Sequence, residues 1–326
     1  MSRHISLETI REAASIIYDV VQRTPLVRLD VPGLATDGTE LFLKLETLQP
    51  IGSFKIRGAY NAVRHLPADR LSQGVWTVSA GNAAQGVALA ARHVGASCSV
   101  MVMDTAPETK LQSIERLGAT IVKAPYEECW RTVQQHASAR MSGQFVHPFD
   151  DDLFISGNGT IGLEIHQDLP DVDAVIAPLG GGGLLVGVAA ALRELCPRAK
   201  IYAAEPETAA PLSVSFAAGR ASEFTQWTSS FVDGAGGRSV LPTMWPLLQD
   251  LVAESLVVPL DDAARAMKTV ADRVHVIMEG AAACAIAAAL SPQFARHGHK
   301  KVVAIVSGGN IDLARFAQLT GSCTST

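Results

Sequence analysis

The chain has 326 residues, of which 48% are hydrophobic and 18% charged, so it can bury the core of one large domain or two moderate ones. Its formal net charge is −5 and its Lys and Arg residues are scattered, which argues against nucleic acid or an anionic membrane as a partner. Five widely spaced cysteines without a CxxC pair argue against a disulfide framework or a structural zinc site.

The predicted elements begin with an amphipathic helix within residues 1–20. Charged and apolar residues follow one another there at helical spacing, and the segment lacks the apolar core of a signal peptide. The longest run of small apolar residues, 280–290, is too short to span a bilayer. The sequence therefore predicts a cytoplasmic protein.

Strands and helices then alternate in two series. The first series predicts strands at 41–46, 75–79, 98–103, 120–124 and 144–147 and helices at 55–66, 82–95, 108–118 and 126–141. The second predicts strands at 173–179, 200–205, 255–260 and 301–307 and helices near 183–195, 208–219, 261–274, 279–290 and 311–318. This alternation is typical of mostly parallel sheets flanked by helices, so we expect an α/β protein with two such layers. The polar segment 147–152 is the candidate crossing between them.

The loop at 180–183 joins a predicted strand to a predicted helix through four consecutive glycines. Such a loop can present its N–H groups to a phosphate at the positive end of a helix; the alternative is a flexible tight turn. A dinucleotide-binding pattern is only partly met, because Gly181, Gly183 and Gly187 place the last glycine one residue late, although Glu205 could serve as its acidic residue. No Walker lysine follows the loop.

Three further loops lie at the starts of predicted helices. In 79–86 Asn82 opens a helix, where a simple N-cap is the alternative to a binding role. In 306–312 Ser307 and two glycines separate a strand from a helix, and alone this would be a turn. The third contains Lys55, after Gly52 and Ser53. A solvated lysine is the common case, but the first turn of a helix disfavours a cation, and desolvation with positive neighbours would leave a free amine able to form an imine.

Taken together, these loops resemble the fold-type II pyridoxal-phosphate (PLP) enzymes, in particular the serine/threonine dehydratase and serine racemase group. The resemblance runs from residue 24 to residue 310, and its motifs are TPLVRL, GSFKIRGA, SAGNAAQG, HPFDD, GTIGLEI, PLGGGGL, AAEPE and SGGNID. It implies a two-domain, tryptophan synthase β-like fold. Residues 1–48 and 149–326 would form the large PLP-binding domain and residues 49–148 the small domain.

The resemblance also implies a role for each loop. Lys55 would hold PLP as a Schiff base, Phe54 would pack by the ring and Asn82 would bind the ring hydroxyl. Ser307 would face the pyridine nitrogen, and Glu279 would lie near the ring unless it is only a helix N-terminal acid. The phosphate would be held by Gly180, Gly181, Gly182, Gly183 and Leu184. The substrate carboxylate would be held by Ser79, Ala80, Gly81, Asn82 and Ala83.

Three positions depart from the family pattern. Racemases of the group carry a serine as a second base where this chain has Ala80, which disfavours racemisation. Many members carry a histidine beside the substrate where this chain has Ala83. Metal-binding members place a carboxylate six residues after the glutamate that corresponds to Glu205, and this chain has Pro211 there. No metal site is therefore predicted.

The sequence thus predicts a PLP-dependent dehydratase, that is, an ammonia-lyase. Lys55, freed by the substrate amine, would remove the Cα proton of a β-hydroxy-α-amino acid while the hydroxyl departs, and the product would hydrolyse to a 2-oxo acid and ammonia. Threonine or serine is the family default, and a bulkier substrate such as phenylserine is a contender. The alternatives are a racemase or another β-eliminating lyase and, from another class, a non-catalytic nucleotide- or effector-binding α/β protein. Family members are commonly homodimers. Because the chain ends soon after SGGNID, we expect no C-terminal effector-binding domain.

Overall fold

The larger of two sheets has six strands in the order β1-β2-β10-β7-β8-β9. The computed structural model describes residues 3–31 and 38–322. Strand β1 is antiparallel to β2, and all other neighbours in this sheet are parallel. The strands are β1 (Leu26–Leu29), β2 (Glu40–Leu45), β7 (Ala174–Pro178), β8 (Lys200–Pro206), β9 (Glu254–Val258) and β10 (Lys301–Val306).

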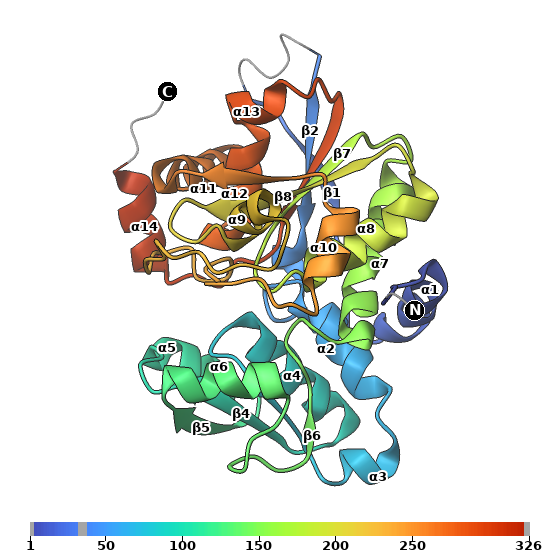
Figure 1. The fold of residues 1–326 in the computed structure, drawn as a ribbon, viewed down its shortest axis with the longest axis vertical. Coiled ribbons are helices and arrows are strands. Elements are labelled where there is room, and N and C mark those ends of the chain that lie inside the picture. The colour runs from blue at the N-terminus through green and yellow to red at the C-terminus, as the bar shows by residue number, and fades with distance from the viewer. Residues whose placement is uncertain (1–2, 32–37, 323–326) are drawn as a thin grey trace.

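The smaller sheet has four parallel strands in the order β5-β4-β3-β6. Its strands are β3 (Val75–Val78), β4 (Cys98–Met103), β5 (Thr120–Ala124) and β6 (Gln144–Phe145). Figure 1 shows this sheet and its helices below the larger sheet, with α2 and the lower end of α7 at the junction. The chain segment that leads into the small sheet, α2, and the segment that leads out of it, α7, therefore meet at this junction.

Helices cover the sheets, and several of them begin directly after a candidate binding loop. They are α1 (Leu7–Ile17), α2 (Lys55–Arg64), α3 (Ala68–Leu71), α4 (Asn82–Val94), α5 (Glu108–Glu115), α6 (Tyr126–Gln135), α7 (Asp152–Asp168), α8 (Gly183–Leu195), α9 (Pro211–Ala218), α10 (Trp245–Leu251), α11 (Leu260–Val274), α12 (Gly280–Ala289), α13 (Pro292–Ala295) and α14 (Leu313–Gly321), with a 3₁₀ turn η2 (Glu46–Leu48). Within the described ranges, none of these helices has the length and apolar character needed to cross a membrane.

Strand β7 shows why the large sheet is covered on both faces. All its residues are buried. Val175 and Ala177 belong to one hydrophobic cluster, whereas Ala174 and Ile176 belong to another. Since successive strand residues point to opposite faces, each face of β7 contributes to a separate core. A strand buried on both faces reads as a continuous apolar run, which is the pattern found in the sequence.

Helix α7 was missed by the sequence interpretation, which treated its start as a polar crossing. Asp151 caps it by accepting a hydrogen bond from the Phe154 N–H at 2.8 Å. Its glycines lower the helix propensity but let other backbone come close. A Cβ built on Gly157 would lie 2.4 Å from the Arg57 carbonyl oxygen, and one on Gly159 would lie 2.9 Å from that of Gly187. Packing against α2 and α8 therefore outweighs the local preference.

Other predicted boundaries differ more modestly. Strand β1 was not predicted as a strand, and the strand expected at 144–147 is confined to Gln144–Phe145. The helix expected at 126–141 ends at Gln135, because His136 adopts a left-handed conformation with φ 56°. Four of the five cysteines are buried and free; Cys323 lies outside the described residues.

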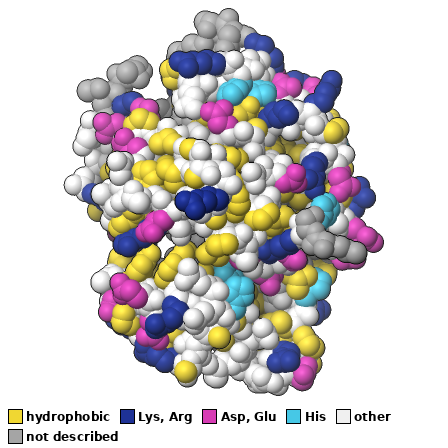
Figure 2. Space-filling model, viewed as in Figure 1, with side chains coloured by type: hydrophobic (Ala, Val, Ile, Leu, Met, Phe, Trp, Pro, Cys, Tyr) yellow, Lys and Arg dark blue, Asp and Glu magenta, His cyan; other side chains and the backbone are white. Residues whose placement is uncertain are grey.

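Basic and acidic side chains are interspersed on the face shown in Figure 2, and neither sign forms a continuous field there. This agrees with the small net charge of −5. An extended polyanion would find no basic stripe on this face to follow.

Candidate active site

Lys55 is the first residue of α2, and its amine lies among aromatic rings and backbone. Its Nζ donates a hydrogen bond to the Pro148 carbonyl oxygen at 2.7 Å and lies 5.2 Å from the ring centre of Phe54 and 5.4 Å from that of Phe154. Burial lowers the pKa of Lys55 to about 8, while the negative charge of Glu279 acts in the opposite direction. The expected positive neighbours are therefore not the cause of the lowered pKa; desolvation is.

The Lys55 loop is joined to the SGGN loop by backbone hydrogen bonds. The Phe54 N–H donates to the Ser307 carbonyl at 3.0 Å, and the Gly309 N–H donates to the Gly52 carbonyl at 2.9 Å. Ser53 and Ser307 are both buried. The Ser53 hydroxyl has no hydrogen-bond partner among the described residues. Two loops separated by most of the chain thus form one wall, with an unpaired buried hydroxyl in it.

Asn82 and Glu279 meet across the junction of the two sheets. The Asn82 Nδ2 donates to Glu279 Oε1 at 2.8 Å, and the Asn310 Nδ2 donates to Asn82 Oδ1 at 2.7 Å. Asn82 is the first residue of α4, after Gly81 at the N-cap, so the simple N-cap considered as its alternative role is not formed. Glu279 does lie at the N-terminus of α12, as its N-cap residue, but its side chain makes no capping hydrogen bond.

Glu279 is the second buried titratable group of this region. Burial, helped by the Asp233 carboxylate, raises the pKa of Glu279 to about 8, and the Asn82 hydrogen bond opposes the rise. A carboxyl whose pKa is raised this far takes up a proton well above the usual range of a glutamate, and in its protonated form it can donate as well as accept a hydrogen bond.

The glycine loop between β7 and α8 has no room for side chains. A Cβ built on Gly181 would lie 2.1 Å from the ring of Phe149, and one on Gly183 would lie 2.6 Å from the Phe149 carbonyl oxygen. Gly182 has φ 94°, a conformation that favours glycine. The N–H groups of residues 181–184 make no hydrogen bond to any described residue. Free donors at the start of a helix form a cradle for an anion.

A backbone loop not singled out by the sequence connects the cradle to Glu279. A Cβ built on Gly180 would lie 2.8 Å from the Gly234 carbonyl oxygen, and one on Gly234 would lie 3.3 Å from Glu279 Oε1. Leu184 packs in the same hydrophobic cluster as Phe54. The predicted phosphate loop is therefore connected to Glu279 through Gly234, and it shares one hydrophobic core with the Lys55 loop.

The predicted carboxylate site is the start of α4. Ser79 Oγ accepts a hydrogen bond from the Gly81 N–H at 3.1 Å. A Cβ built on Gly81 would have no atom within 4 Å, so open space lies beside it. Ala80 is half-buried and Ala83 is buried. The N–H groups of Asn82 and Ala83 have no partner in the described chain, which leaves a second helix start able to bind an anion.

A buried ion-pair network holds the first turn of α2 in place. Arg57, two residues after Lys55, donates to both oxygens of Glu46 at 2.7 and 2.8 Å and to both oxygens of Glu164 at 2.7 and 3.0 Å. Lys44 Nζ lies 2.8 Å from Glu164. Two cations and two carboxylates are thus paired without solvent contact, and a forked guanidinium fixes the orientation of the helix as well as its position.

Several of these groups were not identified from the sequence as functional. Pro148 and Gly234 act through backbone atoms, which carry no side-chain signal, although HPFDD does contain Pro148. Arg57 lies in the motif GSFKIRGA and Asn310 in SGGNID, but the sequence assigned neither a role. Only the fold shows which residues they contact.

Glu205, considered for a ribose or a metal, is fully buried and occupied by protein donors. Its carboxylate accepts the Leu212 N–H at 2.8 Å, the Ser213 N–H at 2.9 Å and the Ser255 hydroxyl. Burial raises the pKa of Glu205 to about 7 against these hydrogen bonds. Pro211 is the first residue of α9. The carboxylate therefore caps α9 from within the fold.

Comparison with known proteins identifies the family. Residues 17–308 match the family model described as "Pyridoxal-phosphate dependent enzyme", so the chain belongs to the PLP-dependent enzymes. It is 38% identical to L-threonine ammonia-lyase of Thermotoga maritima, over 95% of this chain and 76% of that one. It is 36% identical to the catabolic L-threonine dehydratase TdcB of Staphylococcus aureus, over 96% and 91% of the two chains.

Two solved structures share this fold over nearly the whole chain. Serine racemase from maize superposes with a TM-score of 0.88 at 35% identity, over 97% of both chains. The processed form of threonine deaminase isoform 2 from Solanum lycopersicum superposes with a TM-score of 0.85 at 30% identity, over 98% of this chain and 95% of that one. The predicted family, the two-sheet α/β fold, the PLP cofactor and the prediction of a PLP-dependent lyase are confirmed.

The residues present fit PLP. The free N–H groups of residues 181–184 can bind its phosphate. Lys55, an amine with a lowered pKa, can bond to its carbonyl carbon. The buried, unpaired Ser53 hydroxyl and the Glu279 carboxyl, whose pKa is raised, provide further polar partners.

Proposed function

We propose that this protein is an ammonia-lyase that converts a β-hydroxy-α-amino acid to a 2-oxo acid and ammonia. The observation that carries the proposal is Lys55: an amine with a pKa of about 8 at a helix start, in a chain similar to a threonine ammonia-lyase and a threonine dehydratase. Threonine and serine are the first substrates to test, and phenylserine is the bulkier contender.

When bound, PLP supplies an electron sink for the bond broken at Cα. In this proposal the N–H groups of residues 181–184 bind its phosphate, and Lys55 is its covalent attachment point. Asn82, already placed between Glu279 and Asn310, would hold the ring hydroxyl, and Ser307 would hold the ring nitrogen. A serine hydroxyl there, unlike a carboxylate, would not hold the ring nitrogen protonated, so the electron sink that the cofactor would supply would be moderate.

The substrate is held by the start of α4. Its carboxylate accepts the free N–H groups of Asn82 and Ala83, at the positive end of the helix. Lys55 Nζ, once released, would take the proton from the substrate Cα and pass a proton to the departing β-hydroxyl, so that the C–H and C–O bonds break and water leaves. A pKa of about 8 leaves a fraction of this amine neutral at physiological pH, which a proton acceptor requires.

The test combines a substrate panel with two lysine variants. Release of 2-oxo acid is measured from L-serine, L-threonine and phenylserine by the wild type, by Lys55→Ala and by Lys123→Ala, an exposed lysine on β5. We expect turnover by the wild type and by Lys123→Ala, and none by Lys55→Ala. Borohydride followed by peptide mapping should find the cofactor on Lys55. A label on another lysine would overturn the assignment.

The alternative function is amino-acid racemisation, which the similarity to maize serine racemase favours. Ala80 argues against it, because a methyl group cannot donate or accept a proton. We predict that elimination far outruns racemisation, with both enantiomers followed by chiral chromatography. Ala80→Ser is the matched variant, and it should raise the share of D-amino acid. Formation of D-amino acid by the wild type at the rate of 2-oxo acid would favour the racemase.

We also propose the domain limits, the cellular location and the oligomeric state of the protein. Residues 1–48 with 149–326 would form the large PLP-binding domain and residues 49–148 the small one, which is supported by the strands of the smaller sheet, all of which fall within 75–145. We further propose that the protein is cytoplasmic and forms a homodimer; sedimentation of the purified protein tests the homodimer.

A further inference from the structure

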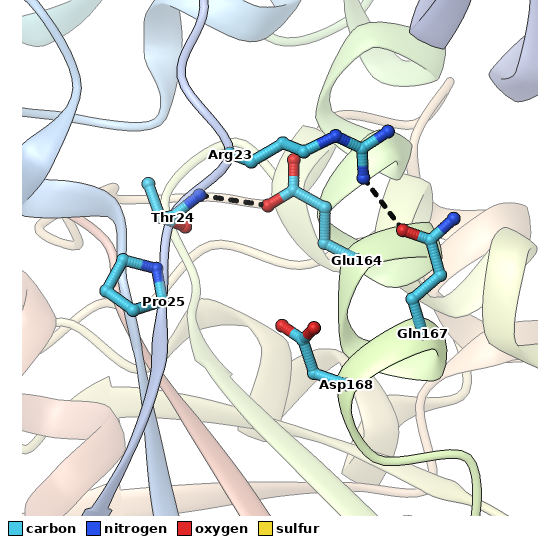
Figure 3. Close-up of a pocket in the computed structure, with 6 residues that line it drawn as sticks. All are labelled: Arg23, Thr24, Pro25, Glu164, Gln167 and Asp168. Atoms are coloured by element: carbon cyan, nitrogen blue, oxygen red, sulfur yellow. Dashed lines mark hydrogen bonds between the residues drawn. The ribbon is translucent and has the colours of Figure 1, made fainter.

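A cavity of about 260 Å³ lies at the C-terminal end of α7, apart from the residues assigned to the active site. It is lined by Arg23, Thr24, Pro25, Glu164, Gln167 and Asp168. Figure 3 shows Arg23 reaching past Glu164 to Gln167, with Asp168, the residue after Gln167, one turn beyond Glu164 along α7. Sites for drug-sized molecules begin near 300 Å³, so this cavity suits a smaller ligand.

Arg23 is a cation already held in position. Its guanidinium carbon lies 4.4 Å from the centre of the Tyr18 ring, and its Nη1 donates to Gln167 Oε1 at 2.7 Å. Among the described residues it makes no ion pair. Its other N–H groups remain available for a carboxylate, and little side-chain entropy is lost when one binds.

Asp168 is the opposite charge at the same cavity. It is the last residue of α7, its side chain is 47% exposed, and its nearest cation is Lys44 Nζ at 3.9 Å. The C-terminal end of a helix favours a positive ligand. Glu164, by contrast, is already paired with Arg57 and Lys44, so Asp168 is the carboxylate free to bind an ammonium group.

The two charges select the class of ligand. A simple anion would be attracted by Arg23 but repelled by Glu164 and Asp168. A simple cation would be attracted by the two carboxylates but repelled by Arg23. A small molecule with both charges satisfies both. We propose that this cavity is a second, non-catalytic site for a free α-amino acid, with its carboxylate on Arg23 and its ammonium on Asp168.

The site shares residues with the network that holds the catalytic helix. Thr24 Oγ1 donates to Glu46 Oε1 at 2.6 Å, and Lys44 Nζ donates to the Thr24 carbonyl at 2.6 Å. Glu46 and Glu164 both bind Arg57. An amino acid in the cavity therefore stabilises the arrangement that places α2 and Lys55, and the catalytic site and the cavity influence each other reciprocally.

The test separates this cavity from the catalytic site. Holoenzyme is reduced with borohydride, so its cofactor is permanently attached and cannot exchange onto an added amine. Binding of L-alanine is then measured by calorimetry, with propionate and ethylamine as ligands that each lack one charge. We expect one saturable alanine site and binding of propionate and ethylamine weaker by roughly tenfold or more, the scale of losing a charge-assisted hydrogen bond.

Two charge-removing variants and one matched control complete the experiment. Arg23→Gln and Asp168→Asn should each weaken alanine binding by roughly tenfold or more, whereas Arg193→Gln, which alters an exposed arginine paired with Asp250, should leave it unchanged. Hydrogen exchange in residues 55–64 should slow with alanine in the wild type and not in Arg23→Gln.

Three results would each overturn the proposal: no saturable alanine binding to the reduced wild type, binding that survives both variants, or propionate binding as tightly as alanine. Because the reduced enzyme is inert, each of these leaves the lyase proposal standing. Conversely, a lyase without this second site would still release 2-oxo acid.

Discussion

At Lys55 a positive charge is disfavoured twice, by burial and by the first turn of α2. The pKa falls to about 8 even though Glu279 acts to raise it. The neutral amine, which is the form that attacks a carbonyl, is thus populated near physiological pH. For a lysine of ordinary pKa this fraction would be roughly 300-fold smaller.

We predict a pH dependence for cofactor attachment. Below its pKa the neutral fraction of Lys55 rises tenfold per pH unit, and above it the fraction is constant, so the rate at which cofactor-free protein takes up PLP should rise to about pH 8 and then level off. The rate is followed by absorbance after mixing. A tenfold rise per unit that continued above pH 9 would mean an unperturbed lysine.

A second prediction concerns Ala83, buried in the first turn of α4. Where a histidine would fill space beside the substrate, alanine leaves volume that an aryl or larger alkyl group could occupy. We expect kcat/KM to be higher for phenylserine than for serine, by about 10- to 200-fold, and Ala83→His to shift the preference back. If serine, threonine and phenylserine keep the same ranking in both proteins, position 83 does not select the side chain.

Among the elements, the first turn of α9 is held by one buried side chain. Glu205 accepts the N–H groups of Leu212 and Ser213, and so binds two of the donors that the first turn of α9 cannot satisfy internally. The Ser255 hydroxyl also donates to this carboxylate. Both Glu205 oxygens therefore already accept hydrogen bonds from protein groups. Residue 211, where metal-binding relatives would carry a carboxylate, is the proline that starts the helix.

We therefore predict that activity is independent of divalent metal. Turnover of the preferred substrate should be the same before and after exhaustive chelation with EDTA. Addition of magnesium or calcium to the chelated enzyme is the control, and it should change nothing. A large loss that either ion restores would contradict this prediction and show that turnover needs a bound metal ion.

Across the whole molecule, Arg57 joins the helix that carries Lys55 to the larger sheet. Its partners Glu46 and Glu164 come from η2, beside β2, and from α7. Guanidinium and carboxylates are all buried, so the net worth of the pairs is small, but the loss of one partner leaves charges unpaired in the interior.

The corresponding prediction is that Arg57→Met lowers the free energy of unfolding by about 3–5 kcal/mol. Denaturation in urea measures it. Arg64→Met, an exposed arginine on the same helix, is the control and should change stability by no more than about 0.5 kcal/mol. A loss below about 1 kcal/mol for Arg57→Met would mean that Lys44 and water compensate the two carboxylates.

The sequence predicted most central strands and most long helices, because a buried parallel strand reads as an apolar run and an amphipathic helix repeats its apolar residues. It did not predict α7 as a helix. Gly157, Gly159 and Gly162 weaken the local helix signal, and they are present because α2 and α8 approach so closely that a Cβ would overlap their atoms. That reason lies in contacts distant along the chain.

What the sequence determined by itself was the chemistry: a lysine at a helix start, a four-glycine loop, and motifs in the order of a PLP-enzyme family. Only the tertiary structure decided which groups meet. The Pro148 carbonyl at Lys55 and the Asn310 amide at Asn82 are contacts between segments separated by about a hundred residues or more. Burial and long-range electrostatics set the pKa values of Lys55 and Glu279, and both depend on the surroundings that folding assembles.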